Sequence, residues 1–498
     1  MPKIKKQKKD FHISSWKAWK NIEKYFKFDN LGATMKKEII GGITTFLAMI
    51  YILSVEPAIL SGSGSVTGDG TTMNYFGIFL GVCIASFAST FVMGLFANVP
   101  LALAPSMGVN VMFAVNIAGG TGANGHPPTI IGYEGALIAT MISSIFFLIF
   151  SITPLRKIII NAIPEQLMIA IGVGIGFFIA YVGLSSIGWV AHTETGLPVA
   201  DLGRLKDNYP QILLGTGLFL IMLLFMFMKV NGGVAICILI GTVIALIVAN
   251  AGPNLAVSKE GGIFYNANFV DGGGKWEYDF NGFASNIKNT WKEFTNVEIW
   301  NKPTMYISIF ILMFLNFFDA TGTITTVNRQ LNEAAGTDRP LSHEALIIDS
   351  GATVVGSAVG VSPMGVYVES GAGIAQGART GFASIITSVF FLISIALFPI
   401  FKAVPGCVTG AATLFVGVMM MGSIKDLDWK KPEIAISAFF AILFMVVTYS
   451  IANGIGVLII LYVLIKTFKK EVKEVPITLW IVSLIFIAYF IAYAFIQL

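Results

Sequence analysis

Long apolar runs recur along the whole chain, and short polar segments separate them. Each run extends over about 20 residues, the length that an α-helix needs to cross the hydrocarbon core of a bilayer. The runs are continuous, whereas strands of a membrane β-barrel alternate between apolar and polar residues. The pattern therefore predicts an all-α polytopic membrane protein with spans at residues 39–60, 75–97, 99–118, 133–153, 165–187, 210–229, 233–251, 303–327, 344–360, 362–378, 380–401, 406–424, 433–450 and 453–468. A further run at 477–497 leaves open an extra C-terminal span.

The composition excludes several other classes of protein. Of the 498 residues, 55% are hydrophobic and only 12% are charged, while soluble domains carry about 25% charged residues. This deficit excludes an ordinary soluble enzyme, a disordered chain and a coiled coil. The three cysteines, Cys83, Cys237 and Cys407, stand singly inside apolar runs. We therefore expect buried thiols rather than a disulfide framework.

Basic residues indicate how the chain is oriented. Residues 1–37 are polar and rich in lysine, and the apolar run that follows them is of span length, so we expect no cleaved signal peptide. With the N-terminus in the cytoplasm, most of the 32 Lys and Arg residues fall on the cytoplasmic side, as the positive-inside rule requires. We therefore expect a multi-pass plasma-membrane protein with a cytoplasmic N-terminus. Two interpretations remain for the segment near that end that carries Trp16, Trp19, Ile22 and Phe26. It is either an amphipathic helix on an anionic leaflet or an unstructured basic tail.

Two of the predicted spans are interrupted by proline, glycine and polar residues. The third contains residues 104–110 (APSMGVN), and the tenth contains residues 362–371 (SPMGVYVESG). They are the third members of two successive sets of seven spans, and an odd number of spans places the second set upside down relative to the first. Non-helical backbone persists in a bilayer only where protein or ligand satisfies its N–H and C=O groups. Broken segments at matching positions of inverted halves are typical of transporters that bind substrate near the midplane.

Carboxylates inside the predicted spans are the candidate functional groups, because an intramembrane acid costs roughly 3 kcal/mol to insert. Asp319 lies in the middle of the eighth span and Glu369 lies in the second broken segment, and neither has a basic residue within a turn. Glu56 precedes Pro57 near the end of the first span, and Asp349 lies in the ninth. These acids are the predicted binding or proton-carrying groups.

The same acids indicate the chemistry of the ligand. They have no intramembrane Lys or Arg partner, which disfavours an anionic substrate, and the histidines lie in loops or at span edges, which disfavours a metal site. One carboxylate accepts two parallel hydrogen bonds, which suits a small, planar, neutral molecule with adjacent N–H groups. A buried carboxyl group also binds a proton readily, so one of the acids can carry a proton during transport.

Four runs of the sequence carry a resemblance to a known family, namely residues 42–60, 102–110, 318–323 and 368–381. They resemble the AzgA-like purine permeases of the nucleobase–ascorbate (xanthine/uracil permease) superfamily. The resemblance implies 14 transmembrane segments as 7+7 inverted repeats, with short non-helical breaks in segments 3 and 10. It also implies proton-coupled import of hypoxanthine, guanine or adenine.

The resemblance further implies a core domain that carries the substrate and moves, in an elevator-like manner, against a gate domain. The expected organisation is a basic cytoplasmic N-terminus with an amphipathic helix at 1–37, core halves at 38–153 and 303–401, gate halves at 154–251 and 402–498, and an extracytoplasmic insert at 252–302.

The family's functional residues transfer to matching positions of this sequence. Asp319 and Glu369 match the substrate-binding acids, and Asn110 matches the polar residue of the third segment that shapes the site. The expected substrate-binding residues are Glu369, Asp319, Asn110, Ser106, Thr323 and Gly365. The expected proton-coupling residues are Asp319, Glu369 and Glu56. Family members usually have glycine where Ser106 stands, so the preferred purine stays open.

Alternative functions remain at this point. A uracil/xanthine carrier or an anion transporter of the same fold is the nearest alternative. An intramembrane aspartyl protease would use Asp319 and Asp349, but the usual Gly-x-Gly-Asp context is missing, so we expect no enzyme. We expect no cofactor, no metal and no nucleic-acid partner. The expected partners are the purine base, the coupling proton and membrane lipid, with a homodimer as one option for the oligomeric state.

Overall fold

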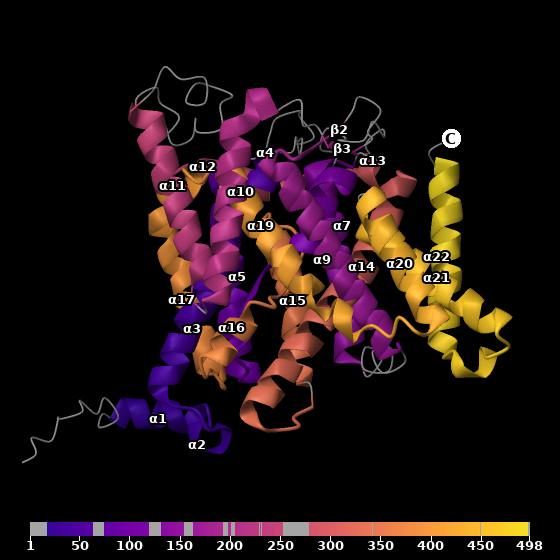
Figure 1. The fold of residues 1–498 in the computed structure, drawn as a ribbon, viewed down its shortest axis with the longest axis horizontal. Helices are drawn as coiled ribbons and strands as arrows, with labels where there is room; N and C mark the ends of the chain where they lie inside the picture. The colour runs from indigo at the N-terminus through magenta and orange to yellow at the C-terminus, as the bar shows by residue number, and fades with distance from the viewer. Residues whose placement is uncertain are drawn as a thin grey trace, which may run out of the picture.

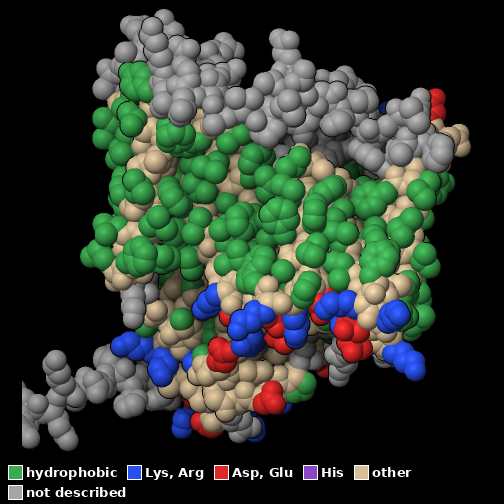
Figure 2. Space-filling model, turned by 45° about the vertical axis from the view of Figure 1, so that its right-hand side comes forward, with side chains coloured by type: hydrophobic (Ala, Val, Ile, Leu, Met, Phe, Trp, Pro, Cys, Tyr) green, Lys and Arg blue, Asp and Glu red, His purple; other side chains and the backbone are tan. Residues whose placement is uncertain are grey.

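The computed structural model describes residues 17–62, 74–118, 131–153, 163–192, 198–200, 205–228, 230, 232–251, 278–340, 342–448 and 450–496. Within these ranges, ten helices are long and apolar enough to cross a membrane. The helices stand side by side in a bundle (Figure 1), and Figure 2 shows a broad belt of hydrophobic side chains above a band of Lys, Arg, Asp and Glu. We call this lower band the charged side. The chain is thus a multi-pass membrane protein, as its apolar runs predict.

The 14 predicted spans all correspond to elements of the structure. The first seven are α3 (Met35–Met49) with α4 (Ile52–Gly62), α5 (Tyr75–Val92) with η2 (Met93–Ala97), β1 (Leu103–Pro105) with α6 (Met107–Met112) and η3 (Phe113–Ile117), α7 (Gly132–Ile152), α9 (Glu165–Ile187), α10 (Leu205–Phe227) and α11 (Gly233–Ala251). The second seven are α14 (Pro303–Ala335), α15 (His343–Ala358), β4 (Met364–Val366) with α16 (Ser370–Ala375), α17 (Gly381–Ser394) with η7 (Ile395–Leu397) and α18 (Phe398–Lys402), α19 (Gly406–Met420) with η8 (Met421–Asp426), α20 (Pro432–Val447) and α21 (Ile451–Phe468).

The packing of one set of seven mirrors that of the other. The fourth element, α7, packs against the ninth, α15, and correspondingly the eleventh, α17, packs against the second, α5. Likewise α14 contacts α7 while α3 contacts α17, and α9 contacts α20 while α19 contacts α10. Each contact recurs when every element is exchanged for the one seven places along the chain. The structure therefore has the two inverted repeats that the sequence predicts.

The two broken segments meet as the strands β1 and β4, which pair antiparallel. Next to the strands, the Ser106 N–H donates to the Pro363 carbonyl (2.8 Å), and the Tyr367 N–H donates to the Ala102 carbonyl (2.9 Å). Unpaired backbone groups at this depth would cost several kcal/mol each. Each broken segment thus satisfies the backbone of the other, and the predicted interruptions are confirmed.

A buried carboxylate ties α3 to α17. Glu38 lies in the first turn of α3 and is fully buried. It accepts hydrogen bonds from the backbone N–H groups of Arg379 (2.7 Å), Thr380 (3.2 Å) and Ala383 (3.2 Å). The first N–H groups of a helix have no partner within that helix, and its N-terminal end favours negative charge. Glu38 therefore caps α17 from a neighbouring helix.

The helices α9 and α19, which occupy equivalent places in the two repeats, pack backbone against backbone. Glycines make this approach possible: a Cβ atom on Gly183 would lie 2.5 Å from the Leu414 nitrogen, and one on Gly417 would collide with the Ala180 nitrogen. Small residues let membrane helices approach closely and gain van der Waals contact. The glycines of this pair thus allow α9 and α19 to pack with their backbones close together.

Other elements lie around the 14 spans. α1 (Lys17–Tyr25) and α2 (Phe28–Leu31) lie below the bundle (Figure 1), and the Phe26 ring lies 5.7 Å from the Phe382 ring. Trp16 lies outside the described residues.

Residues 252–277 of the predicted insert also lie outside the described residues. The remainder of the insert forms α12 (Phe280–Phe294) and α13 (Val297–Trp300), and α12 packs against α5 and α7. The strands β2 (Val190–His192) and β3 (Pro198–Ala200) form a small hairpin. The last apolar run forms α22 (Ile477–Ile496), which packs against α21.

Candidate functional site

A cavity lies where the paired strands β1 and β4 face α9 and α19. It contains about 390 Å³ of empty space, part of which is open to solvent. The side of the cavity formed by the α3–α4 turn, the broken segments and α14 consists of Tyr51, Ser106, Met107, Gly108, Asp319, Thr323 and residues 366–369. The side formed by α9 and α19 consists of Ile175, Ile179, Val416 and Met420. One wall therefore carries the hydroxyl and carboxyl groups, and the other is apolar.

Glu369 is held in the cavity wall by a tyrosine. It directly precedes α16, and the Tyr51 hydroxyl donates a hydrogen bond to its Oε1 atom (2.7 Å). The Tyr51 side chain is buried, whereas Glu369 is partly exposed, so the hydrogen bond holds a carboxylate that a ligand can reach. An ionised carboxylate has about four acceptor positions, and this contact uses one of them. Glu369 can therefore accept further hydrogen bonds from a ligand.

Asp319 is held by the first broken segment. Its Oδ2 atom accepts a hydrogen bond from the Ser106 hydroxyl (2.5 Å). Gly108 and Gly365 lie beside the same carboxylate: a Cβ atom on either would lie 3.8 Å and 3.7 Å, respectively, from its oxygens. The neighbouring Thr323 hydroxyl donates to the Asp319 carbonyl (2.9 Å). Small residues on both broken segments thus leave space around this acid.

Glu56 occupies a separate, fully buried position at the crossing. Its Oε1 atom accepts from the Ser362 hydroxyl (2.6 Å), and its Oε2 atom accepts from the Asn110 side-chain amide. Ser362 belongs to the second broken segment and Asn110 to α6 after the first. Both Glu56 and Asn110 are 0% exposed, so this carboxylate ties the two segments together away from the cavity.

The structure brings together four of the residues that the sequence predicts for the site. Ser106, Asp319, Thr323 and Glu369 line one cavity. The lining does not include Asn110, Gly365 or Glu56.

Other lining residues had no individual signal in the sequence. Tyr51 lies within the run 42–60, but an aromatic residue in an apolar span is as typical of packing as of binding. Ile175, Ile179 and Val416 look like ordinary span residues. Only their position opposite the acids identifies them.

The charges near the cavity restrict the chemistry. None of the described residues that line it is Lys, Arg or His. Asp349, the second acid of the protease alternative, accepts a hydrogen bond from the Val366 N–H (3.3 Å) and is not part of the lining. Among the described residues, no group of three or more His, Cys, Asp or Glu side chains could hold a metal ion.

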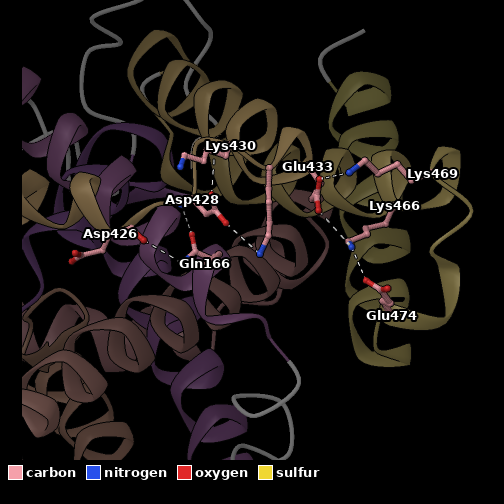
Figure 3. Close-up of polar contacts among 9 residues, drawn as sticks. Gln166, Asp426, Asp428, Lys430, Glu433, Lys466, Lys469 and Glu474 are labelled. Carbon is pink, nitrogen blue, oxygen red and sulfur yellow. Dashed lines mark hydrogen bonds and ion pairs between the residues drawn. The ribbon is translucent and has the colours of Figure 1, made fainter.

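A second polar cluster lies at the charged side, where it joins α20 and α21 (Figure 3). The Lys466 side chain is only 8% exposed, and its Nζ atom lies 2.6 Å from a Glu471 oxygen and 2.8 Å from a Glu474 oxygen. Glu433, in the first turn of α20, accepts from Lys469 (2.7 Å). The buried charges are thus paired, as burial requires. The cluster fixes the ends of these helices and the segment that leads to α22.

Comparison with known proteins identifies the family. Residues 36–457 match the family described as "Permease family" (Xan_ur_permease). The chain is 33% identical over 472 residues to the guanine/hypoxanthine permease PbuG of Bacillus subtilis, with 94% of this chain and 99% of that protein covered. It is 29% identical over 468 residues to the adenine permease AdeP of Escherichia coli, with 94% and 95% covered.

Solved structures support the fold. The transmembrane domain of the cyanobacterial bicarbonate transporter BicA superposes with a TM-score of 0.58 at 17% identity, covering 84% of this chain and 97% of that one. This domain shares the fold of seven plus seven inverted repeats. The family match spans most of the chain, and the relatives are transporters rather than enzymes. The chain therefore belongs to the permease family Xan_ur_permease.

Proposed function

We propose that the chain is a secondary active transporter that imports the purine nucleobases hypoxanthine, guanine or adenine together with protons. The observation that carries this proposal is that Asp319 and Glu369 line one cavity whose described lining contains no basic residue. The names of PbuG and AdeP, a guanine/hypoxanthine and an adenine permease, support purines as the substrate class.

A purine base suits the two walls of the cavity. Its adjacent N–H groups can donate in parallel to the Glu369 carboxylate. Its flat apolar faces can pack on the wall that contains Ile175, Ile179 and Val416. An anionic substrate would meet two acids without a balancing cation, so anion transport is disfavoured. A uracil or xanthine substrate is the alternative that the competition experiment below addresses.

The distribution of polar groups supports an elevator-like motion. In our proposal the core domain comprises residues 38–153 and 303–401, and the gate domain comprises 154–251 and 402–498. Every hydrogen-bonding side chain of the cavity then belongs to the core, while the gate contributes only apolar side chains. A core that carries all polar contacts can slide along an apolar wall without breaking hydrogen bonds to the substrate.

Proton coupling follows from the cost of moving charge. We propose Asp319, Glu369 and Glu56 as the proton-binding groups. An uncompensated carboxylate is expensive at bilayer depth, so a proton bound by one of the acids would lower the cost of moving the loaded core. We place the N-terminus and the charged side in the cytoplasm, where the positive-inside rule puts basic residues.

The proposal is tested by uptake of radiolabelled hypoxanthine into proteoliposomes. Glu369→Gln replaces two acceptor oxygens by one, and a hydrogen bond to a charged group contributes about 1.5–3 kcal/mol. We therefore expect uptake to fall about tenfold or more. Glu165→Gln is the matched control, because the Glu165 side chain is 72% exposed at the start of α9. Undiminished uptake by Glu369→Gln would show that this carboxylate does not take part in transport.

Competition by unlabelled guanine, adenine, xanthine, uracil and bicarbonate, measured at several pH values, defines the substrate. Purine bases should compete and bicarbonate should not. A rise in uptake as the external pH falls is expected for proton symport. Competition by uracil alone would favour the alternative substrate class.

A further inference from the structure

A second cavity adjoins the first and is larger. It encloses about 720 Å³ of empty space, part of it open to solvent, between α9, the C-terminal half of α14 and the end of α19 with η8. We call it the vestibule. It shares Ile175, Asp319, Thr323, Val368 and Met420 with the first cavity, so the two lie side by side.

The vestibule extends from the paired strands β1 and β4 toward the charged side. Gln330, which lines it, lies eleven residues beyond Asp319 on α14, or about 16 Å along the helix axis at about 1.5 Å per residue. Its other lining residues include Met168, near the start of α9, and Ser423 in η8. Arg329, beside Gln330, pairs with Glu165 (3.7 Å). The end of the vestibule near Gln330 therefore lies beside charged residues.

One wall of the vestibule is a polar stripe along α14. Thr323 and Thr326 both line it, and each hydroxyl donates to its own helix, Thr323 to Asp319 O (2.9 Å) and Thr326 to Gly322 O (2.7 Å). Because each hydroxyl proton is used, the oxygen is left as an acceptor. The stripe thus continues the acceptor chemistry of the acids toward the charged side.

Gln330 ends the stripe with an amide that offers both donor and acceptor. Its side chain lies over Gly371 at the start of α16, where an added Cβ atom would collide with its Oε1 atom. Among the described residues, no hydrogen bond to the Gln330 amide is found. The amide is therefore positioned by packing but free to pair with a ligand.

The facing wall is mainly apolar and contains three methionines. Met168 from α9 and Met419 and Met420 from α19 line the vestibule. Their flexible, polarisable thioethers make favourable contacts with aromatic rings and adapt to different shapes. A polar stripe on one side and soft sulfur-containing side chains on the other suit a flat ring with polar edges.

We propose that the vestibule is a second, weaker binding subsite for planar nitrogen heterocycles, with Thr326 and Gln330 contacting the ring edge and the three methionines contacting its face. The inference rests on the proposed function, since the ligand is of the same class as the proposed substrate. A base that leaves the first cavity would bind here before it reaches the charged side, and a base present on that side would bind here first.

Photolabelling tests the proposal. The full-length protein in lipid nanodiscs is illuminated with an 8-azidopurine at increasing concentrations, and labelled peptides are mapped by mass spectrometry. We expect one labelled group near Tyr51 and residues 366–369 at low probe concentration. We expect a second group around Met168 and Met419, which line only the vestibule, at concentrations at least tenfold higher. Excess unlabelled hypoxanthine should displace both.

Variants separate the two sites. Gln330→Leu and Thr326→Val should each reduce labelling of the vestibule at least threefold while labelling of the first cavity persists, which also shows that the variants are folded. Thr325→Val is the matched control, because Thr325 is exposed on the same helix and lines neither cavity. Glu369→Gln should reduce only the first group.

Other outcomes overturn one proposal or the other. Labelling confined to the first cavity, or vestibule labelling that hypoxanthine does not displace or that neither Gln330→Leu nor Thr326→Val reduces, would exclude the subsite while leaving the proposed function intact. Absence of displaceable labelling at both places would contradict both proposals.

Discussion

Glu56 and Asp319 have similar partners, because each accepts a hydrogen bond from a serine of a broken segment. Glu56 accepts a hydrogen bond from Ser362 of the second broken segment, and Asp319 accepts one from Ser106 of the first. Their surroundings differ, because Glu56 is fully buried and has a second donor, whereas Asp319 is 8% exposed and lines both cavities. The inverted repeat thus places one acid beside each broken segment. The neighbouring residues determine which acid can contact a ligand.

Tyr51 is the residue whose removal most directly tests the geometry of Glu369. Tyr51→Phe keeps the ring and deletes the only hydroxyl seen to donate to the Glu369 side chain among the described residues. We expect the KM for purine uptake to rise about tenfold, since a hydrogen bond to a charged group contributes about 1.5–3 kcal/mol. Tyr75→Phe is the control, because Tyr75 does not line the cavity and donates to Ser54 O at 3.5 Å. An unchanged KM would show that Tyr51 does not position the carboxylate.

The acids could be predicted from the sequence, whereas their partners could not. A lone carboxylate in an apolar span is conspicuous because its insertion is costly, and this reasoning identified Asp319 and Glu369. Ile175 and Val416 belong to apolar runs in which lipid-facing, core and ligand-facing residues have the same chemistry. Only the fold shows that they face the acids.

At the scale of elements, the close packing of α9 against α19 is expected to stabilise the fold. Gly417→Val places two methyl groups where the α9 backbone lies, and overpacking of this kind costs about 1–3 kcal/mol. We expect a lower apparent Tm in detergent, measured by loss of the monodisperse peak after heating. Gly217→Val is the matched control on α10, where an added Cβ atom meets no other atom within 4 Å. Equal Tm values for the two variants would contradict the packing argument.

The broken segments show what a sequence pattern can predict about elements. Proline and glycine at bilayer depth predicted the interruptions in the third and tenth spans, because neither residue favours a continuous helix. The pairing of β1 with β4 depends on two segments far apart in the chain, so no local pattern contains it. The hydrogen bonds that this pairing supplies are the reason the interruptions are tolerated.

At the scale of the molecule, the 14 spans could be predicted because the bilayer fixes both the length and the polarity of each crossing segment. The mutual position of the proposed core and gate is a matter of tertiary packing. Leu47 on α3 and Gly232 before α11 are in contact across this boundary: a Cβ atom on Gly232 would lie 3.7 Å from that of Leu47. This distance is within the range that a disulfide bridges.

The elevator-like motion is therefore testable with the double variant Leu47→Cys/Gly232→Cys. Oxidation should join core to gate and abolish purine uptake, and reduction with a thiol should restore it. The positive φ of Gly232 (72°) makes Cys there strained by roughly 1 kcal/mol, which the reduced sample controls for. Full uptake by the oxidised protein, with the cross-link verified by mass spectrometry, would exclude relative motion at this boundary.

The pairing of β1 with β4 also constrains how the protein is made. A ribosome delivers β1 long before β4, so the N-terminal half enters the bilayer with backbone donors and acceptors that have no strand to pair with. Those groups are completed only when the second half arrives with the opposite orientation. Assembly of the paired strands is thus a late event that needs both halves of the polypeptide, and an arrested, half-length product would lack the contacts that make its interrupted third segment tolerable in lipid.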